Sequence, residues 1–287
     1  MSLCIGVHVP FIDFETLETS QFDCVQIYFG NNLDVSLERL LTFRDSGKKL
    51  FVHASLMYNL CGSKEGEVCP KYKRNLEFTR NGLLRDLDIC AVLGAPLVVH
   101  VGAAKDRDWG ISKVAETVDF VLSQKSCLTD KFSKALEKDI RKERLLLLEN
   151  CAGEGTKLGR DIPELSSLWS QIKNKEQTKF CIDTCHGFAS GTMNFGTKEG
   201  IREFWKEWES SFPGGSLHLF HLNDSKTPFG SKVDRHETLL CGYIWDEKPK
   251  VLRYFLESAK DRSIPLVLER KDNTIEKELE VCKALTS

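Results

Sequence analysis

Histidines and carboxylates recur at the carboxyl ends of short apolar segments of this chain. Phe51-Val52-His53 and Val98-Val99-His100 each run from apolar residues into an imidazole, and Leu147-Leu148-Glu149 runs into a carboxylate. Both side-chain types are common ligands of zinc and similar metals. The candidate ligands, taken along the whole chain, are His53, His100, Glu149, Asp183, His186, His221, Asp234, His236 and Glu269.

A single residue of this set has an ordinary explanation. A buried histidine can be hydrogen-bonded to a neighbour, and an acid can pair with a lysine. The set as a whole does not fit that explanation, because parallel strands would aim these side chains at one small volume. Several carboxylates there would repel one another unless cations were present. The pattern therefore predicts bound metal ions.

The tripeptide Asp234-Arg235-His236 contributes two of the candidates. In an extended loop, residues two apart point the same way, so Asp234 and His236 can chelate one ion together. The alternative is a solvated surface loop, and it is weakened by the position of the tripeptide just after the His221 segment. Asp183 and His186 are three residues apart at the end of a predicted strand, a spacing that could serve two adjacent ions.

The donor types indicate which metal, and their number indicates how many. Imidazole and carboxylate without thiolate suit zinc, with manganese or iron as substitutes. Nine candidates exceed what one zinc ion uses, so the set favours two or three metals with a bridging carboxylate. Cys151 and Cys185 lie beside candidate ligands in the sequence and are interpreted as packing residues.

The elements that position these residues follow from the apolar pattern. Leu83, Leu84, Leu87 and Cys90 recur at helical spacing before Gly94, and a similar pattern runs from Ile201 to Trp208. Strand-length apolar segments precede and follow such helices, as in an α/β fold. Eight of them are present: Cys4–Val9, Cys24–Phe29, Leu50–Ser55, Pro96–Val101, Arg144–Glu149, Phe180–His186, Leu217–Asn223 and Pro265–Glu269.

Eight strand and helix units in 287 residues match a (β/α)₈ TIM barrel, expected here as one domain over residues 1–287. An open doubly wound sheet would give a similar local pattern. The barrel is preferred because barrel enzymes carry their chemistry at the carboxyl ends of the strands, where the candidate ligands stand.

Composition limits where the protein acts and how it could bind nucleic acid. A formal charge of −2 argues against binding by bulk positive charge, so any DNA contact must be local. The eleven cysteines are scattered without a CxxC pair, which favours reduced thiols over disulfides. No membrane span or signal peptide is visible, so we expect an intracellular protein, cytoplasmic or nuclear and not secreted.

Four sequence blocks resemble the endonuclease IV family of abasic-site endonucleases. They are HLNDSK (221–226), GSKVDRH (230–236), LENCAGEGTKLG (148–159) and CIDTCHGFASG (181–191). The resemblance implies a xylose isomerase-like TIM barrel with a trinuclear zinc site, acting as a monomer on double-stranded DNA that contains abasic sites. It implies hydrolysis of the phosphodiester 5′ to the abasic site, which leaves a 3′-hydroxyl and a 5′-deoxyribose phosphate, and trimming of blocked 3′ ends.

The family pattern also distributes the ligands. His53, His100 and Glu149 would hold one ion, and His186, Asp234 and His236 another. The second ion would take Glu149, Asp183, His221 and Glu269. Glu149, Asp183 and Glu269 are thus the candidate catalytic carboxylates. A hydroxide shared by two of the ions would attack the phosphate, because zinc lowers the pKa of its water.

The predicted DNA contacts depart from the family pattern. Leu56 and Met57 stand where relatives carry a tyrosine and a leucine that wedge into DNA, and apolar wedges remain able to part base steps. The loop Gly30–Asp34 lacks the arginine that relatives insert. The segment Cys61–Arg74 carries four basic residues that either are solvated or grip phosphate. The other candidate phosphate contacts are Lys226, Lys232 and Arg235.

Two rival functions remain. A metal-dependent sugar isomerase or epimerase of the same barrel class needs Glu149, Asp183, His221 and Glu269 but has no use for the other ligands. A protein that only binds damaged DNA, or acts as a scaffold, would be expected to have lost ligands, and none is missing.

Overall fold

Eight parallel strands close into a barrel in the computed structural model, which describes residues 3–10, 22–29, 36–45, 47–63, 76–269 and 274–286. The order around the barrel is β1-β10-β7-β6-β5-β4-β3-β2. The predicted (β/α)₈ architecture is confirmed, and the open sheet is excluded. The strands are β1 (Ile5–Pro10), β2 (Cys24–Tyr28), β3 (Lys49–His53), β4 (Leu97–His100), β5 (Leu146–Glu149), β6 (Thr178–Asp183), β7 (Leu217–His221) and β10 (Leu266–Leu268).

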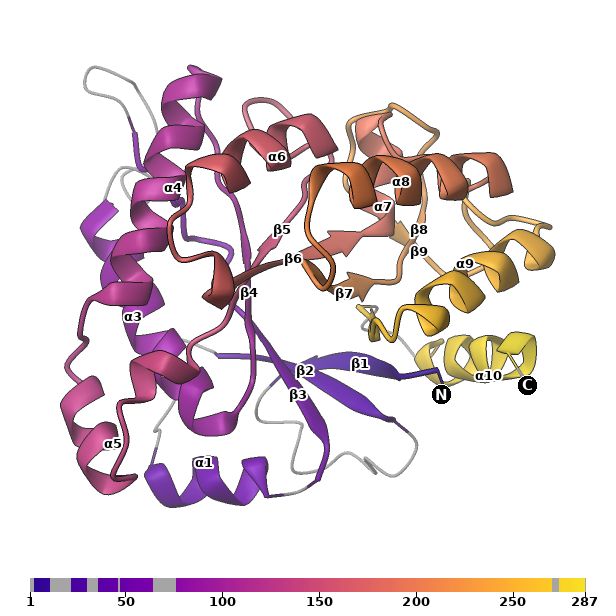
Figure 1. The fold of residues 1–287 in the computed structure, drawn as a ribbon. Helices are drawn as coiled ribbons and strands as arrows, with labels where there is room; N and C mark the ends of the chain where they lie inside the picture. The colour runs from indigo at the N-terminus through magenta and orange to yellow at the C-terminus, as the bar shows by residue number, and fades with distance from the viewer. Residues whose placement is uncertain are drawn as a thin grey trace.

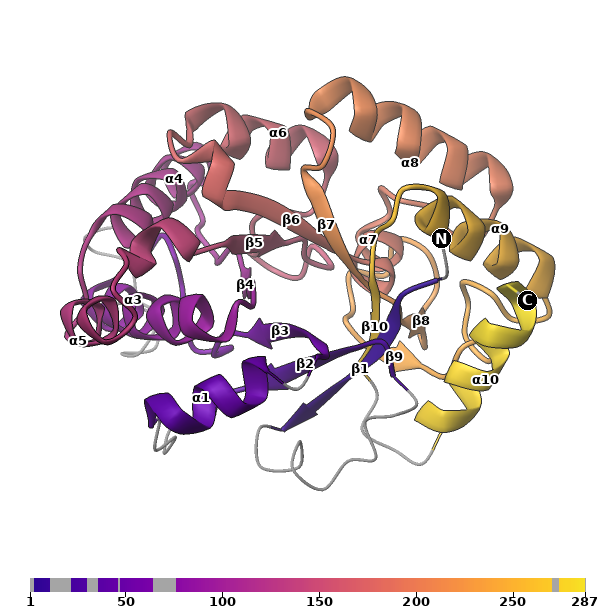
Figure 2. The same ribbon diagram turned by 60° about the horizontal axis from the view of Figure 1, so that its bottom comes forward.

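Helices surround these strands on the outside (Figures 1 and 2). The helix predicted to end at Gly94 is α3, and Gly94 has the positive φ of 66° that favours glycine at a helix end. None of the helices described is long and apolar enough to cross a membrane. Their bounds are α1 (Leu37–Arg44), α3 (Leu76–Leu93), α4 (Arg107–Ser123), α5 (Thr129–Ala135), α6 (Ile162–Gln171), α7 (Thr184–Ser190), α8 (Lys198–Ser211), α9 (Pro249–Asp261) and α10 (Ile275–Thr286).

The segment after β6 differs from the prediction. A strand was expected through His186, but β6 ends at Asp183 and α7 begins at Thr184. The side chain of Asp183 accepts a hydrogen bond from the backbone N–H of His186 at 2.8 Å, which caps the helix. His186 is therefore presented by the first turn of a helix rather than by a strand.

The chain after β7 also turns earlier than predicted. β7 ends at His221, and after Leu222 and Asn223 the chain forms the short strand β8 (Asp224–Ser225). β8 pairs antiparallel with β9 (His236–Glu237), with Ser225 opposite His236. This pairing brings the loop that carries Asp234 and His236 back to the mouth of the barrel.

The interior of the barrel is filled by one layer of buried apolar side chains below the candidate ligands. Because side chains alternate along a strand, the residue two positions further on faces the same interior. Seven strands follow this rule. The apolar layer is Cys24, Phe51, Val98, Leu147, Cys181, Leu219 and Val267, and the layer above it is Gln26, His53, His100, Glu149, Asp183, His221 and Glu269.

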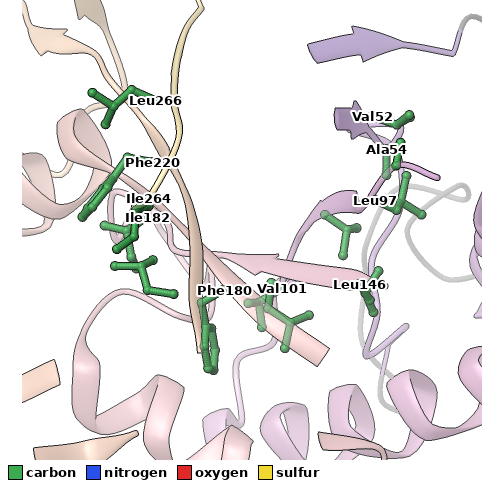
Figure 3. Packing of buried hydrophobic residues seen from close by; sticks show 14 of the residues in the cluster. Val52, Ala54, Leu97, Val101, Leu146, Phe180, Ile182, Phe220, Ile264 and Leu266 are labelled. Atoms are coloured by element: carbon green, nitrogen blue, oxygen red, sulfur yellow. The ribbon is translucent and has the colours of Figure 1, made fainter. Parts of the chain in front are cut away.

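The remaining strand, β1, contributes Gly6 and His8 to the same two levels. A Cβ at Gly6 would lie 1.8 Å from the carbonyl oxygen of Cys24, so no side chain fits there. The outward residues of the strands pack under the helices, and Figure 3 shows part of this cluster around Val52, Phe180 and Phe220. Each such buried side chain contributes roughly 1.5–3 kcal/mol of transfer free energy, which makes the barrel a rigid support for the upper layer.

Candidate metal centre

Seven of the nine candidate ligands line one cavity of about 500 Å³ at the carboxyl ends of the strands. The other two, Asp183 and His221, are fully buried beside Glu149 and Glu269. Six of the nine end or directly follow barrel strands, as predicted. His186 comes from the first turn of α7, Asp234 from the loop before β9, and His236 from β9 itself. The register places two pairs of ligands side by side, because His100 is opposite Glu149 and Asp183 is opposite His221.

The first group consists of His53, His100 and Glu149. Their ligand atoms lie within 4.8 Å of one another. Oε2 of Glu149 is 3.1 Å from Nε2 of His53 and 3.7 Å from Nδ1 of His100. Nδ1 of His53 donates to the carbonyl oxygen of Ala54 at 2.7 Å, which leaves the lone pair of Nε2 directed at the cavity.

The second group consists of Glu149, Asp183, His221 and Glu269, again within 4.8 Å. Nδ1 of His221 lies 3.0 Å from Oε1 of Glu149 and 3.3 Å from Oε2 of Glu269. Glu149 thus turns one oxygen toward each group. This is the position that a carboxylate bridging two ions requires.

The third group joins His186, Asp234 and His236 through the two oxygens of Asp234. Nε2 of His186 is 3.1 Å from Oδ2 of Asp234, and Nε2 of His236 is 3.3 Å from its Oδ1. His236 also lies 3.5 Å from Oδ2 of Asp183, which connects this group to the second. The thiol of Cys185, interpreted from the sequence as packing, is buried within 4.8 Å of Asp234 and His236.

These separations fit metal coordination. Ligands about 2.1 Å from a tetrahedral zinc ion lie about 3.4 Å from one another. The nitrogen-to-oxygen distances in the three groups run from 3.0 to 3.7 Å, and several exceed normal hydrogen-bond lengths. The residues present therefore fit the metal ions that the sequence predicts, in both donor chemistry and spacing.

The charges of the site point the same way. Burial alone would raise the pKa of Glu149, but His100 and His221 outweigh it and hold the pKa of this carboxyl well below its usual value. Burial raises the pKa of Asp183 and lowers that of His100 to about 4. Among the described residues that line the cavity, none is lysine or arginine. Bound metal cations would compensate the carboxylates of this cavity.

Three amide side chains missed in the sequence hold the ligands in place. Oδ1 of Asn150 accepts from the backbone N–H of Asp183 at 2.7 Å, and the backbone carbonyl oxygen of Asn150 accepts from Nδ1 of His186 at 3.0 Å. Asn223 donates to Oδ2 of Asp183 at 2.7 Å and to Oε2 of Glu269 at 3.1 Å. Both follow a strand-end ligand closely, so their position was a usable signal.

Gln26 is the third amide and the most completely engaged. Its Nε2 donates to Oε1 of Glu269 at 3.0 Å and lies 2.7 Å from Nδ1 of His8. Its Oε1 accepts from Nε2 of His221 at 2.9 Å. The proton on Nε2 leaves Nδ1 of His221 free to face Glu149 and Glu269. Gln26 is fully buried, and a polar residue inside the apolar run 24–29 was the signal in the sequence.

The predicted DNA contacts lie around the mouth. Leu56 and Met57 are 70% and 40% exposed in the turn after β3, and Leu56 lines the cavity. Lys226, Lys232 and Arg235 are exposed near β8 and β9, with Lys226 3.7 Å from Glu237. The loop Gly30–Asp34 and the basic residues Lys64, Lys71, Lys73 and Arg74 lie outside the described residues.

Comparisons with known proteins show the family to which this chain belongs. The family model for the xylose isomerase-like TIM barrel matches residues 14–285. Apurinic-apyrimidinic endonuclease 1 of Schizosaccharomyces pombe is 31% identical over 228 residues, which are 78% of this chain and 58% of that protein. The endonuclease 4 homolog of Dictyostelium discoideum is 29% identical over 246 residues, 82% of this chain and 40% of that protein. The chain thus spans about half the length of these curated relatives.

A solved structure gives the same answer for the fold. Endonuclease IV from Thermus thermophilus superposes with a TM-score of 0.74 at 24% identity, over 98% of each chain. The chain belongs to the xylose isomerase-like TIM barrel family. Within that family it resembles endonuclease IV, as its four sequence blocks predict.

Proposed function

We propose that this chain is a zinc-dependent endonuclease of DNA repair that hydrolyses the phosphodiester bond 5′ to an abasic site. The products would be a 3′-hydroxyl and a 5′-deoxyribose phosphate, and the same site would trim blocked 3′ ends. The observation that carries the proposal is the position of Glu149, whose two oxygens face the first and the second ligand groups. Asp183 of the second group lies next to His236 of the third. The names of the curated relatives support the substrate.

The ligands would divide among the ions as the groups do. His53, His100 and Glu149 would hold one ion, and His186, Asp234 and His236 another, while Glu149, Asp183, His221 and Glu269 would hold the ion between them. Zinc, when bound, lowers the pKa of a coordinated water to near neutrality and neutralises phosphate oxygens. Manganese is an expected substitute.

The protein's own contribution is position and charge. Glu149, Asp183 and Glu269 are held by histidines and amides on rigid strand ends, so little reorganisation accompanies the reaction. The exposed Leu56 and Met57 would wedge into the duplex beside the cavity. Lys226, Lys232 and Arg235 would contact backbone phosphates. We expect a monomer that acts in the cytoplasm or nucleus.

A sugar isomerase or epimerase is the second candidate, since the group Glu149, Asp183, His221 and Glu269 would suffice for its single metal. It leaves the five remaining ligands without a role, although they converge on the same cavity. Metal analysis of zinc-replete protein distinguishes the two. About three zinc ions per chain support the nuclease, and about one supports the isomerase.

The direct test is a duplex that carries one tetrahydrofuran analogue of an abasic site. This analogue cannot undergo β-elimination, so nicking of it reports hydrolysis. We expect a single cut on the 5′ side that a chelator abolishes and added zinc restores. An intact duplex after incubation with zinc-replete protein would defeat the proposal.

A further inference from the structure

A second cavity, of about 200 Å³, opens directly beside the metal centre. It shares Leu56, His100 and Asp234 with the metal cavity, so the two cavities adjoin. Its lining also includes Val101, Leu158 and Lys157. Of the described residues that line it, Lys157 is the single lysine or arginine. A strand of DNA bound at the metals and extending into this cavity would therefore pass close to this ammonium group.

The backbone of Lys157 is fixed by three elements. Its N–H donates to the carbonyl oxygen of Glu154 at 3.0 Å, and it forms an antiparallel bridge with Ala103 in the loop after β4. Its carbonyl oxygen accepts from Arg107 of α4 at 3.0 Å. Arg107 is itself held by both oxygens of Glu164, at 2.6 and 2.7 Å. Lys157 thus has a defined place beside the metal centre.

The side chain is held as firmly as the backbone. Nζ of Lys157 donates to Oε2 of Glu154 at 2.5 Å, and Oε1 of Glu154 accepts from the backbone N–H of Asp234 at 2.9 Å. Glu154 therefore ties the lysine to the loop that carries a candidate metal ligand. An ammonium group has three N–H donors, and Glu154 takes one. The others are available to a ligand, because 40% of the side chain is exposed.

We propose that Lys157 is a substrate-binding residue whose ammonium group binds a phosphate oxygen of the DNA strand next to the metal centre. The proposal rests on the proposed function and adds Lys157, which lies within the block 148–159, to the predicted DNA contacts. The metal cavity is lined by carboxylates, and none of its described lining residues is lysine or arginine, so a positive charge held at its edge would attract the backbone and set its register. Lysine serves as a point-charge donor to phosphate.

The test compares two lysines in similar ion pairs. Lys157 pairs with Glu154, and Lys113 on α4 pairs with Glu116 at the same sequence separation and similar exposure. The variants Lys157→Met and Lys113→Met therefore change net charge equally. The probe is a duplex already nicked on the 5′ side of the tetrahydrofuran residue, which is the product of the proposed reaction. Its binding to zinc-loaded protein is measured by fluorescence anisotropy over a range of KCl concentrations.

We expect Lys157→Met to bind roughly tenfold more weakly at low salt, with a slope of log K against log[KCl] that is smaller by about 0.9. Lys113→Met and Lys157→Arg should keep the wild-type slope. Equal slopes for Lys157→Met and the wild type would overturn the inference. Nicking of the intact duplex by the wild type tests the proposed function separately, so the two failures are distinguishable.

Discussion

Two regions of this molecule bury charged side chains, and they differ in whether those charges are paired within the protein. The first, the Asp88–Arg144 cluster, joins Asp88 of α3 to Arg144 just before β5, and both side chains are fully buried. Arg144 donates to Oδ1 of Asp88 at 2.7 Å and to the carbonyl oxygens of Val121 and Gln124. Oδ2 of Asp88 accepts from Thr129 at 2.6 Å. The charges of Asp88 and Arg144 neutralise each other, and both side chains find hydrogen-bond partners within the protein. We call this a closed cluster.

The second region, the candidate metal centre, has no such internal counter-charge, and we call it the open cluster. It gathers four carboxylates around five imidazoles, and no described residue lining its cavity is a lysine or arginine. The two regions also lie at opposite ends of β5, with Arg144 before the strand and Glu149 at its end. In barrels the amino end serves stability and the carboxyl end serves function. A polar cluster that satisfies itself is structural, whereas one that leaves charge uncompensated is built to bind something.

The largest effect that this comparison predicts is at Glu149. Glu149→Ala removes the carboxylate between two ligand groups, so cleavage of the abasic duplex should fall by more than roughly a thousandfold. The metal-free melting temperature should change by only a few degrees, because the residue belongs to the open cluster. Steady-state incision assays and calorimetry of metal-free protein measure the two quantities.

The control for this variant is Glu143→Ala, which removes an exposed glutamate near the other end of β5. It should leave both incision and melting unchanged. If Glu149→Ala kept near-normal turnover with full metal content, the bridging role would be wrong. If it unfolded the metal-free protein, the distinction between the two clusters would be lost.

The closed cluster should respond in the reverse manner. Arg144→Met leaves Asp88 buried without a counter-charge, so we expect a loss of about 3–5 kcal/mol in the free energy of unfolding, measured by urea titration. Adding Asp88→Leu removes the stranded charge and should recover most of that loss. A double variant no more stable than Arg144→Met would show that the cluster acts through something other than charge pairing.

The sequence was sufficient for the histidines and carboxylates of the upper layer, but not for Gln26 or for the residues around the layer. His53, His100 and Glu149 could be found because each ends an apolar run, and a period of two points it into the interior. The sequence predicts His186 on a strand, whereas the structure has it on a helix. The difference arises because the side chain of Asp183 caps that helix, and the apolar pattern does not reveal this hydrogen bond. Arg144 and Asp88 are 56 residues apart, so nothing local marks them as a buried pair.

Gln26 belongs to the same upper layer and tests how far the open cluster depends on uncharged neighbours. Gln26→Met keeps the side-chain volume but removes the acceptor that fixes the tautomer of His221 and the donor to Glu269. Outer-sphere partners of this kind are worth roughly 10- to 100-fold in metal affinity. We expect zinc binding in chelator competition to weaken by that amount, with incision restored at higher zinc.

The matched control is Gln171→Met, which alters an exposed glutamine of α6. It should leave zinc affinity unchanged. A purely structural role for Gln26 would lower the metal-free unfolding free energy without shifting the zinc titration, and that result would count against the tautomer argument. Weakened zinc binding with little loss of metal-free stability would instead show that the metal centre depends on uncharged amides as well as on its ligands. The cluster at Arg144 differs, because its two charged side chains pair directly with each other.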